Sequence, residues 1–115
     1  MVKKKVFISQ PMSGKKEREI LEDRKKILEN LAHFAIYEEN IEIINTYIKD
    51  EPPEDSNIRL WYLGKTVELL AQADLVVFAK GWARARGCRV ERECAKIYHI
   101  PAVIMDDDDT ISVEE

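Results

Sequence analysis

The stretch Asp74-Leu-Val-Val-Phe-Ala79 decides the fold that this sequence predicts. After its acidic first residue it is continuously apolar, and it is rich in β-branched and aromatic side chains, which favour strands. A strand without polar alternation is typical of a sheet that is covered on both faces, and such sheets are mostly parallel. The stretch therefore predicts a central strand of a parallel sheet with helices on both sides.

The chain on either side of this strand alternates between strand and helix patterns. Short β-type runs are expected at residues 6–8, 41–47 and 101–105, and helical spacing at residues 17–35, 58–73 and 88–99. This alternating order predicts parallel strands joined by right-handed crossovers. We therefore expect an α/β fold, a flavodoxin-like or Rossmann-like three-layer sandwich with about four strands in the order 2-1-3-4. Residues 1–105 would form a single domain and residues 106–115 an acidic tail.

The charges are unevenly distributed along the 115 residues. The whole chain has 18 Lys and Arg against 22 Asp and Glu, but the segment after Met105 holds six of the acids and no base. The remaining body has 18 bases and 16 acids and is close to neutral. This balance excludes the large basic surface that duplex DNA requires.

Cysteine content and hydropathy limit the remaining classes. Cys88 and Cys94 are six residues apart, a spacing that fits neither a disulfide framework nor a zinc knuckle. No segment approaches the roughly 18 consecutive apolar residues that a membrane span needs. We therefore expect a soluble, cytoplasmic protein with no membrane partner, no metal and no cofactor.

The expected topology also predicts where a ligand would bind. In a doubly wound sheet, ligands lie beyond the carboxyl ends of the strands, at the point where the winding reverses. For the strand order 2-1-3-4, this point lies between the first and the third strand. The loops at residues 9–15 and 81–88 should therefore meet at the binding site.

The helix after the second loop carries two acidic residues of different orientation. Its buried apolar arc is expected to hold Val90, Cys94, Ile97 and Tyr98. In helical projection Glu91 lies at the edge of this arc, whereas Glu93 points to solvent. A carboxylate in a crevice wall can act as a nucleophile or general base. The alternative is that Glu91 only reflects the preference for acidic residues in the first turn of a helix.

Three segments stand out by their order and spacing. They are Val6-Phe7-Ile8-Ser9-Gln10-Pro11-Met12-Ser13-Gly14, Leu70-Ala71-Gln72-Ala73-Asp74-Leu75-Val76-Val77 and Gly87-Cys88-Arg89-Val90-Glu91. Together they resemble the nucleoside 2-deoxyribosyltransferase superfamily, which includes deoxynucleotide N-glycosidases, and in particular its short bacterial and phage branch. The last segment has the Gly-x-x-x-Glu form in which that superfamily places its nucleophile, and the nucleophile maps onto Glu91.

The resemblance implies cleavage or transfer of the N-glycosidic bond of a deoxynucleoside or its 5′-monophosphate, by a homo-oligomer. Glu91 would attack C1′ of the deoxyribose and form a glycosyl-enzyme, which water or a second base would resolve. The backbone amides of Ser13 and Gly14, with Ser13 as the N-cap of the first helix, would hold a 5′-hydroxyl or a phosphate. The other substrate-binding residues expected are Ser9, Gln10, Pro11, Thr66, Trp82, Arg86 and Gly87.

One position departs from the pattern of that superfamily. Its active members carry an Asp eight residues before the position of Asp74, and this chain has Thr66 there. A threonine hydroxyl can donate a hydrogen bond but cannot supply the charge of a carboxylate. The alternative function is therefore a non-catalytic nucleotide-binding or sensing module with the same fold. Asp74 itself lies at the opposite end of its strand and is expected to be structural.

The second loop contains further candidates with two interpretations each. Trp82, Arg84 and Arg86 could stack on a base and pair with a phosphate, or they could cover the loop or contact a second subunit. Cys88 could be a thiol with a lowered pKa at the start of a helix, or a small packed side chain.

Overall fold

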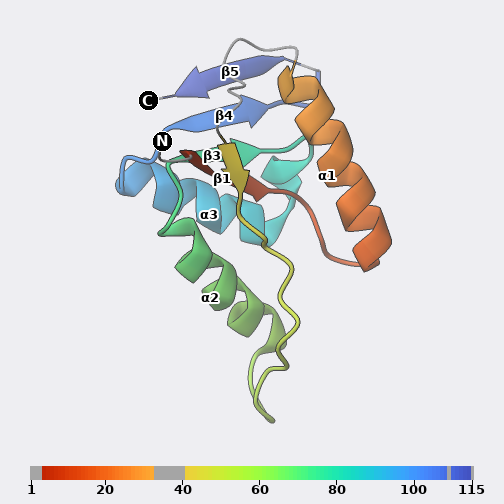
Figure 1. Ribbon diagram of the computed structural model, residues 1–115. Coiled ribbons are helices and arrows are strands. Elements are labelled where there is room, and N and C mark those ends of the chain that lie inside the picture. The colour runs from red at the N-terminus through yellow and green to blue at the C-terminus, as the bar shows by residue number, and fades with distance from the viewer. Residues whose placement is uncertain (1–3, 33–40, 109, 115) are drawn as a thin grey trace.

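The computed structural model describes residues 4–32, 41–108 and 110–114 and shows a five-stranded sheet with three α-helices (Figure 1). The strands are β1 (Lys4–Ser9), β2 (Ile41–Ile43), β3 (Leu75–Phe78), β4 (Ala102–Met105) and β5 (Ile111–Glu114). The helices are α1 (Glu17–Ala32), α2 (Ile58–Leu70) and α3 (Arg86–Ile97), and a short 3-10 helix, η1 (Trp82–Arg84), precedes α3. The α/β class predicted from the sequence is thus confirmed.

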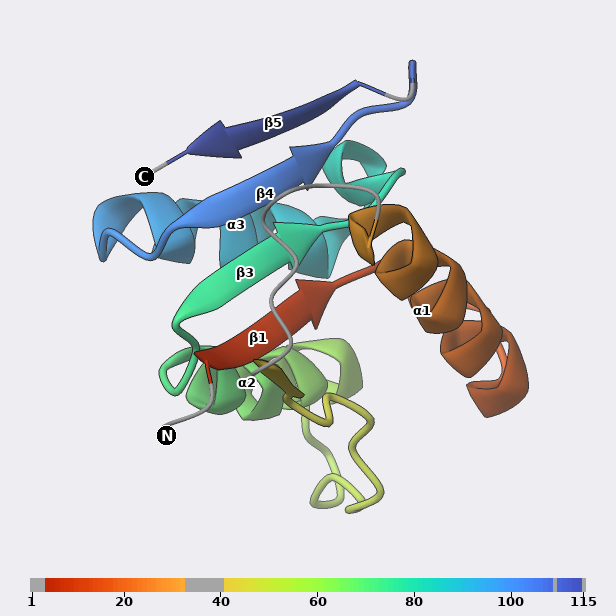
Figure 2. The same cartoon turned by 45° about the horizontal axis from the view of Figure 1, so that its top comes forward.

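The sheet has the strand order β2-β1-β3-β4-β5. The pairs β1–β2, β1–β3 and β3–β4 are parallel, and β4–β5 is antiparallel. The order differs from the expected 2-1-3-4 because a fifth strand is added beside β4, as Figure 2 shows. The sheet is therefore mixed and five-stranded, not parallel and four-stranded.

The additional strand lies inside the segment predicted to be an acidic tail. Two hydrogen bonds close the turn that precedes it: Asp106 N donates to Thr110 O (2.9 Å), and Thr110 N donates to Asp108 Oδ1 (3.0 Å). Ile111 then pairs with Met105 of β4 and packs against the apolar core. The ion pair between Glu114 and Arg92 of α3 fixes the other end of β5. Most of the predicted tail therefore forms a hairpin with β4.

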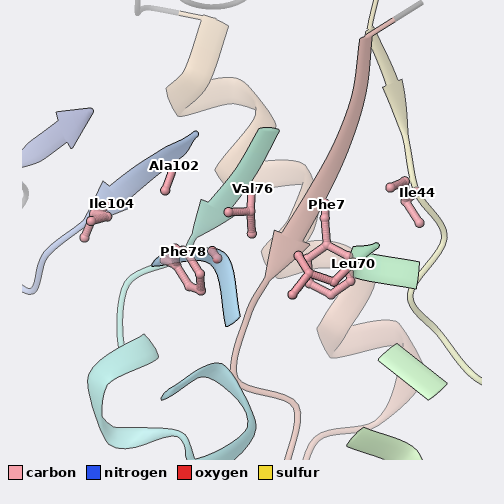
Figure 3. Close-up of a cluster of buried hydrophobic side chains, with 8 residues drawn as sticks. Phe7, Ile44, Leu70, Val76, Phe78, Ala102 and Ile104 are labelled. Atoms are coloured by element: carbon pink, nitrogen blue, oxygen red, sulfur yellow. The ribbon is translucent and has the colours of Figure 1, made fainter. Parts of the chain in front are cut away.

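Helices cover both faces of the sheet, as the apolar character of β3 predicts. On one face, α1 packs with Ile27 against Val6 and Ile8 of β1. On the other face, α2 and α3 pack with Leu70 and Ala95 against a cluster that includes Phe7, Phe78 and Ile104 (Figure 3). Neighbouring residues of β1 thus point to opposite faces, which is the period of a strand.

The helix boundaries follow from local chemistry. α2 begins at Ile58 because the side chain of Asn57 accepts a hydrogen bond from Leu60 N (3.1 Å), which satisfies one free donor of the first turn. The last part of the expected first helix, residues 33–35, lies outside the described residues. No helix in the described parts of the chain is long and apolar enough to cross a membrane.

Asp74 joins β1 and β3 at the end of the sheet where these strands begin. Its Oδ2 accepts a hydrogen bond from Lys5 N (2.8 Å), and its own backbone N donates to Lys5 O (2.8 Å). This pair locks the beginning of β3 to β1, so the structural role predicted for Asp74 is confirmed. The parallel strands end at the opposite end of the sheet, which is where doubly wound α/β folds in general bind their ligands.

Candidate functional site

The two loops predicted to meet do so at the carboxyl ends of β1 and β3. Ala79 N, directly after β3, donates to Ser9 O at the end of β1 (2.9 Å). Gly81 has a φ of +92°, and a Cβ atom at this position would lie 3.4 Å from Pro11 Cγ. Only glycine adopts this backbone conformation readily. The glycine therefore lets the second loop turn closely against Pro11 of the first.

Glu91 is the buried carboxylate at this junction, with 6% of its surface exposed. Ser9 Oγ donates a hydrogen bond to Glu91 Oε1 over 2.7 Å, and the side chain of Thr66 in α2 also hydrogen-bonds to Glu91. Burial raises the pKa of Glu91 above its usual value, and the hydrogen bonds from Ser9 and Thr66 oppose that rise. Three of the predicted site residues, Ser9, Thr66 and Glu91, are thus brought together from three separate elements.

The hydroxyl of Thr66 has two neighbours that accept hydrogen bonds. Its Oγ1 lies 3.0 Å from Leu63 O, one turn earlier in α2. A hydroxyl has a single proton to donate. Thr66 can therefore donate either to Leu63 O or to Glu91 at any moment, and it supplies no charge to the site.

The buried face of α3 differs from the apolar arc predicted for it. Val90, Ile97 and Tyr98 are 40%, 63% and 76% exposed, so this part of the prediction is wrong. The buried side chains are instead Cys88, Glu91 and Ala95. These positions recur every three or four residues and form one helical stripe. Glu93 is exposed, as the helical projection predicts.

Cys88 is a packed side chain rather than a reactive one. The thiol is buried beside Ser9 and Glu91, and burial together with the charge of Glu91 raises the pKa of Cys88 to about 11, against a smaller opposing effect of Ser9. Nucleophilic cysteines need a lowered pKa because the thiolate is the reactive form. The interpretation of Cys88 as an activated thiol is therefore wrong.

Ser13 and Gly14 lie in a turn that ends before α1 begins. Lys15 N donates to Met12 O (3.1 Å), both Ser13 and Gly14 are exposed, and Gly14 has a φ of +77°. α1 begins only at Glu17. Ser13 is therefore not its N-cap, and the argument that these two amides belong to the amino-terminus of the helix is wrong.

Gln10 belongs to a buried polar network that the sequence analysis did not foresee. Its Oε1 accepts a hydrogen bond from Arg24 Nε of α1 (2.9 Å), and Arg24 Nη2 donates to Thr46 Oγ1 after β2 (2.5 Å). All three side chains are at least 93% buried, and burial lowers the pKa of the Arg24 guanidinium. A sequence signal was present: Arg24 is a charged residue on the same helical stripe as Ile20 and Ile27.

The structure separates the candidates of the second loop. The Trp82 ring packs 5.7 Å from the ring of Phe78 against the apolar core, which fits the interpretation as a loop cover. Arg84 forms an ion pair with Asp107. At Gly87 a Cβ atom would lie 3.8 Å from Leu63 Cδ1 of α2, an ordinary van der Waals contact, so the packing of α2 against α3 does not require a glycine there.

Arg86 is not brought to Glu91. The two residues are five positions apart in α3, which places them roughly 140° apart around the helix at 100° per residue. Arg86 lines a shallow, open depression on the outer side of α3 together with Arg89, Val90 and Glu93. A direct role of Arg86 beside the carboxylate therefore has no support in the geometry.

Comparisons with known proteins give a family but no activity. Neither the curated proteins nor the solved structures contain a match to this chain. A model of one protein family, described as a domain of unknown function (DUF4406), matches residues 4–104, which include both loops, Arg24, Thr66 and Glu91. With that match over most of its length, the chain belongs to the DUF4406 family.

Proposed function

We propose that this protein cleaves or transfers the N-glycosidic bond of a deoxynucleoside or its 5′-monophosphate, with Glu91 as the nucleophile. The observation that carries the proposal is the environment of Glu91: a buried carboxylate whose hydrogen bonds come from neutral hydroxyl groups, at the edge of the sheet where the two loops meet. A flavodoxin-like sandwich would bind its ligand at this edge. The similarity of three segments to the nucleoside 2-deoxyribosyltransferase superfamily points to the same residue.

The environment of Glu91 suits a covalent step on a sugar. In that step a carboxylate oxygen of Glu91 bonds to C1′, and the base leaves with the electron pair of the C1′–N bond and takes up a proton. Water then attacks C1′, which releases the sugar and restores the carboxylate; a second base in place of water gives transfer. The carboxylate must be ionised for the attack. Ser9 helps to keep it so, without neutralising its charge as an arginine or lysine would.

One observation favours a second candidate function, a nucleotide-binding module without chemistry. Retaining glycosidases of the usual kind use two carboxyl groups, and the second protonates the leaving group. Within the part of the chain that the structure describes, the side chains that hydrogen-bond to Glu91 are Ser9 and Thr66, and neither is an acid. A base that leaves without help from an acid would do so slowly. The binding module therefore predicts the same ligands and no product.

The experiment that tests the proposal is a chromatographic assay of base release. The protein is incubated with a panel of deoxynucleosides and their 5′-monophosphates, with and without a free acceptor base. Glu91→Gln keeps the shape of the side chain and removes its charge, whereas Glu93→Gln is the matched control, because Glu93 lies on the exposed face of the same helix.

Each outcome assigns the function. Free or exchanged base that disappears in Glu91→Gln and persists in Glu93→Gln supports glycosyl chemistry. Undiminished turnover of Glu91→Gln rules out Glu91 as the nucleophile. No product, with ligands that still raise the melting temperature, favours the binding module.

A further inference from the structure

The interior of the protein holds a guanidinium group on the face of α1 that is otherwise apolar. Arg24 is only 7% exposed and lies between Ile20 and Ile27, which are 4% and 8% exposed. Transfer of a charged group from water to the protein interior is costly unless the charge is paired and hydrogen-bonded. An apolar side chain would fit the pattern of the helix without that cost. The position of Arg24 therefore calls for an explanation other than packing.

The partners of Arg24 in the described chain are neutral oxygens. Nε donates to Gln10 Oε1 and Nη2 donates to Thr46 Oγ1. The orientation of Gln10 is fixed as well, since its Nε2 donates to Ile20 O (3.0 Å) and its oxygen must then face Arg24. These bonds hold the guanidinium in one position and satisfy part of its donor set, but they do not balance its charge.

The network lies at the same strand end as Glu91, on the other face of the sheet. Ser9 and Gln10 are consecutive residues at the end of β1; Ser9 contacts Glu91 of α3, and Gln10 contacts Arg24 of α1. Thr46 follows β2, so it also lies beyond the carboxyl end of a parallel strand. A ligand over the end of β1 would meet Glu91 on one side and Arg24 on the other.

The guanidinium is held in the manner of an oxyanion receptor. Arginine presents five N–H donors in a rigid plane, and a pair of neighbouring donors matches two oxygens of a phosphate or carboxylate. Nε and Nη2 form one edge of that plane, and Gln10 and Thr46 accept from this edge. The end edge, formed by Nη1 and the second Nη2 proton, has the geometry to bind two oxygens of an anion. A bound anion would supply a negative charge that the described partners of Arg24 do not carry.

We propose that Arg24, positioned by Gln10 and Thr46, is an anion-binding site at the carboxyl end of β1 and that it takes a phosphate group. This inference goes beyond the chemistry proposed for Glu91 and does not depend on it. Phosphate is the favoured anion because it offers several strong acceptor oxygens and about −1.5 to −2 charges at neutral pH. The phosphate could be inorganic or part of a nucleotide, and both share the chemistry that Arg24 recognises.

The test is a binding measurement by calorimetry at constant ionic strength. The ligands are inorganic phosphate, deoxynucleoside 5′-monophosphates and the matched deoxynucleosides, and the protein carries Glu91→Gln so that no substrate is consumed. Arg24→Gln removes the charge, Arg24→Lys keeps the charge without the planar fork, and Arg18→Gln on the exposed side of α1 is the matched control. Thr46→Val is a second, milder variant that removes one of the two side chains holding the guanidinium.

We expect a phosphate-bearing ligand to bind about tenfold more weakly, or worse, after Arg24→Gln, an intermediate loss after Arg24→Lys, and no change after Arg18→Gln. If Arg24→Gln does not fold, a lowered affinity of Thr46→Val for phosphate supports the site, and an unchanged affinity contradicts it. Binding of inorganic phosphate identifies the free ion as a ligand, and binding of monophosphates alone identifies a nucleotide. The proposal is overturned if no phosphate-bearing ligand binds, or if all of them bind Arg24→Gln as well as they bind the parent protein.

Discussion

Replacement of Ser9 by alanine should shift the titration of Glu91 and, with it, the pH dependence of stability and of activity. The Ser9 hydroxyl donates to Glu91 Oε1 over 2.7 Å, and both side chains are buried. A hydrogen bond to a charged group contributes about 1.5–3 kcal/mol. Because the bond stabilises the ionised carboxylate more than the protonated one, its loss should raise the pKa of Glu91 further.

The sign of the effect follows from the proton balance. Burial raises the pKa of Glu91 in the folded state, so between its unfolded and folded pKa values the folded protein binds more protons than the unfolded chain. The free energy of unfolding therefore falls as the pH rises through that window. Ser9→Ala raises the folded-state pKa of Glu91 and so extends this pH window to higher pH. The loss of unfolding free energy that the substitution causes should therefore be larger above the window than below it. At alkaline pH we expect a loss of about 1.5–3 kcal/mol, and at acidic pH a smaller loss of about 0.5–1.5 kcal/mol.

Urea unfolding of four proteins between pH 4 and pH 9 measures this effect: the parent, Ser9→Ala, Glu91→Gln and the double variant. In the Glu91→Gln background the alanine removes only a bond between neutral groups, so its cost should no longer depend on pH. The acid limb of any base-release activity should move to higher pH in Ser9→Ala, in the same direction as the pKa of Glu91. An identical cost of Ser9→Ala at every pH and in both backgrounds would refute the conclusion that the Ser9 hydroxyl stabilises the ionised form of Glu91.

Three further predictions address other parts of the molecule. Thr66→Asp should raise base release if a second carboxyl group limits the chemistry, and an unchanged rate would remove that explanation. Deletion of residues 111–115 removes β5 and the Glu114–Arg92 ion pair and exposes the edge of β4. The melting temperature should fall, and light scattering during a thermal scan should show aggregation. An unaltered melting curve would contradict the structural role of β5. With a pKa of about 11, only about one Cys88 thiol in a thousand is ionised at pH 8. Cys88 should therefore react with a thiol reagent only after unfolding. Fast labelling of both Cys88 and Cys94 in the native protein would contradict the burial of Cys88.

Most of the fold could be predicted because the apolar pattern of the strands leaves little choice. β3 and β4 are buried on both faces, and their continuous apolar runs indicate a covered sheet. β5 was not predicted, for a physical reason. It is an edge strand of which Ile111 packs against the core, and the rest of its short sequence, Ser112, Val113 and Glu114, is exposed. Its pairing depends on the turn at 106–110, whose hydrogen bonds come from aspartate and backbone groups rather than from an apolar pattern.

The position of the candidate site could be predicted from the sequence, but the side chains that surround it could not. Topology alone predicted which loops meet, since strand order determines where the winding reverses. The buried face of α3 was missed because a helix is usually assigned its buried side from its large apolar residues. Here the stripe that faces the sheet consists of Cys88, Glu91 and Ala95, which are small or charged, while Val90 and Ile97 lie outside. A buried carboxylate interrupts the apolar pattern, so the helix face that carries it is not recognised from large apolar residues.

The arrangement of the two buried charges at the end of β1 argues for a ligand rather than for structure. Glu91 and Arg24 have opposite charges, and a direct salt bridge between them would offset part of the cost of burying each. The fold instead keeps them on opposite faces of the sheet, where the neutral side chains of Ser9 and Gln10 form hydrogen bonds with them. Such an arrangement leaves the charge of each group available to a bound molecule, at a cost in stability that apolar residues would not impose. Substitution of either residue by an apolar one should therefore cost more in ligand affinity than in the free energy of unfolding, whereas a purely structural pair of charges would show the reverse.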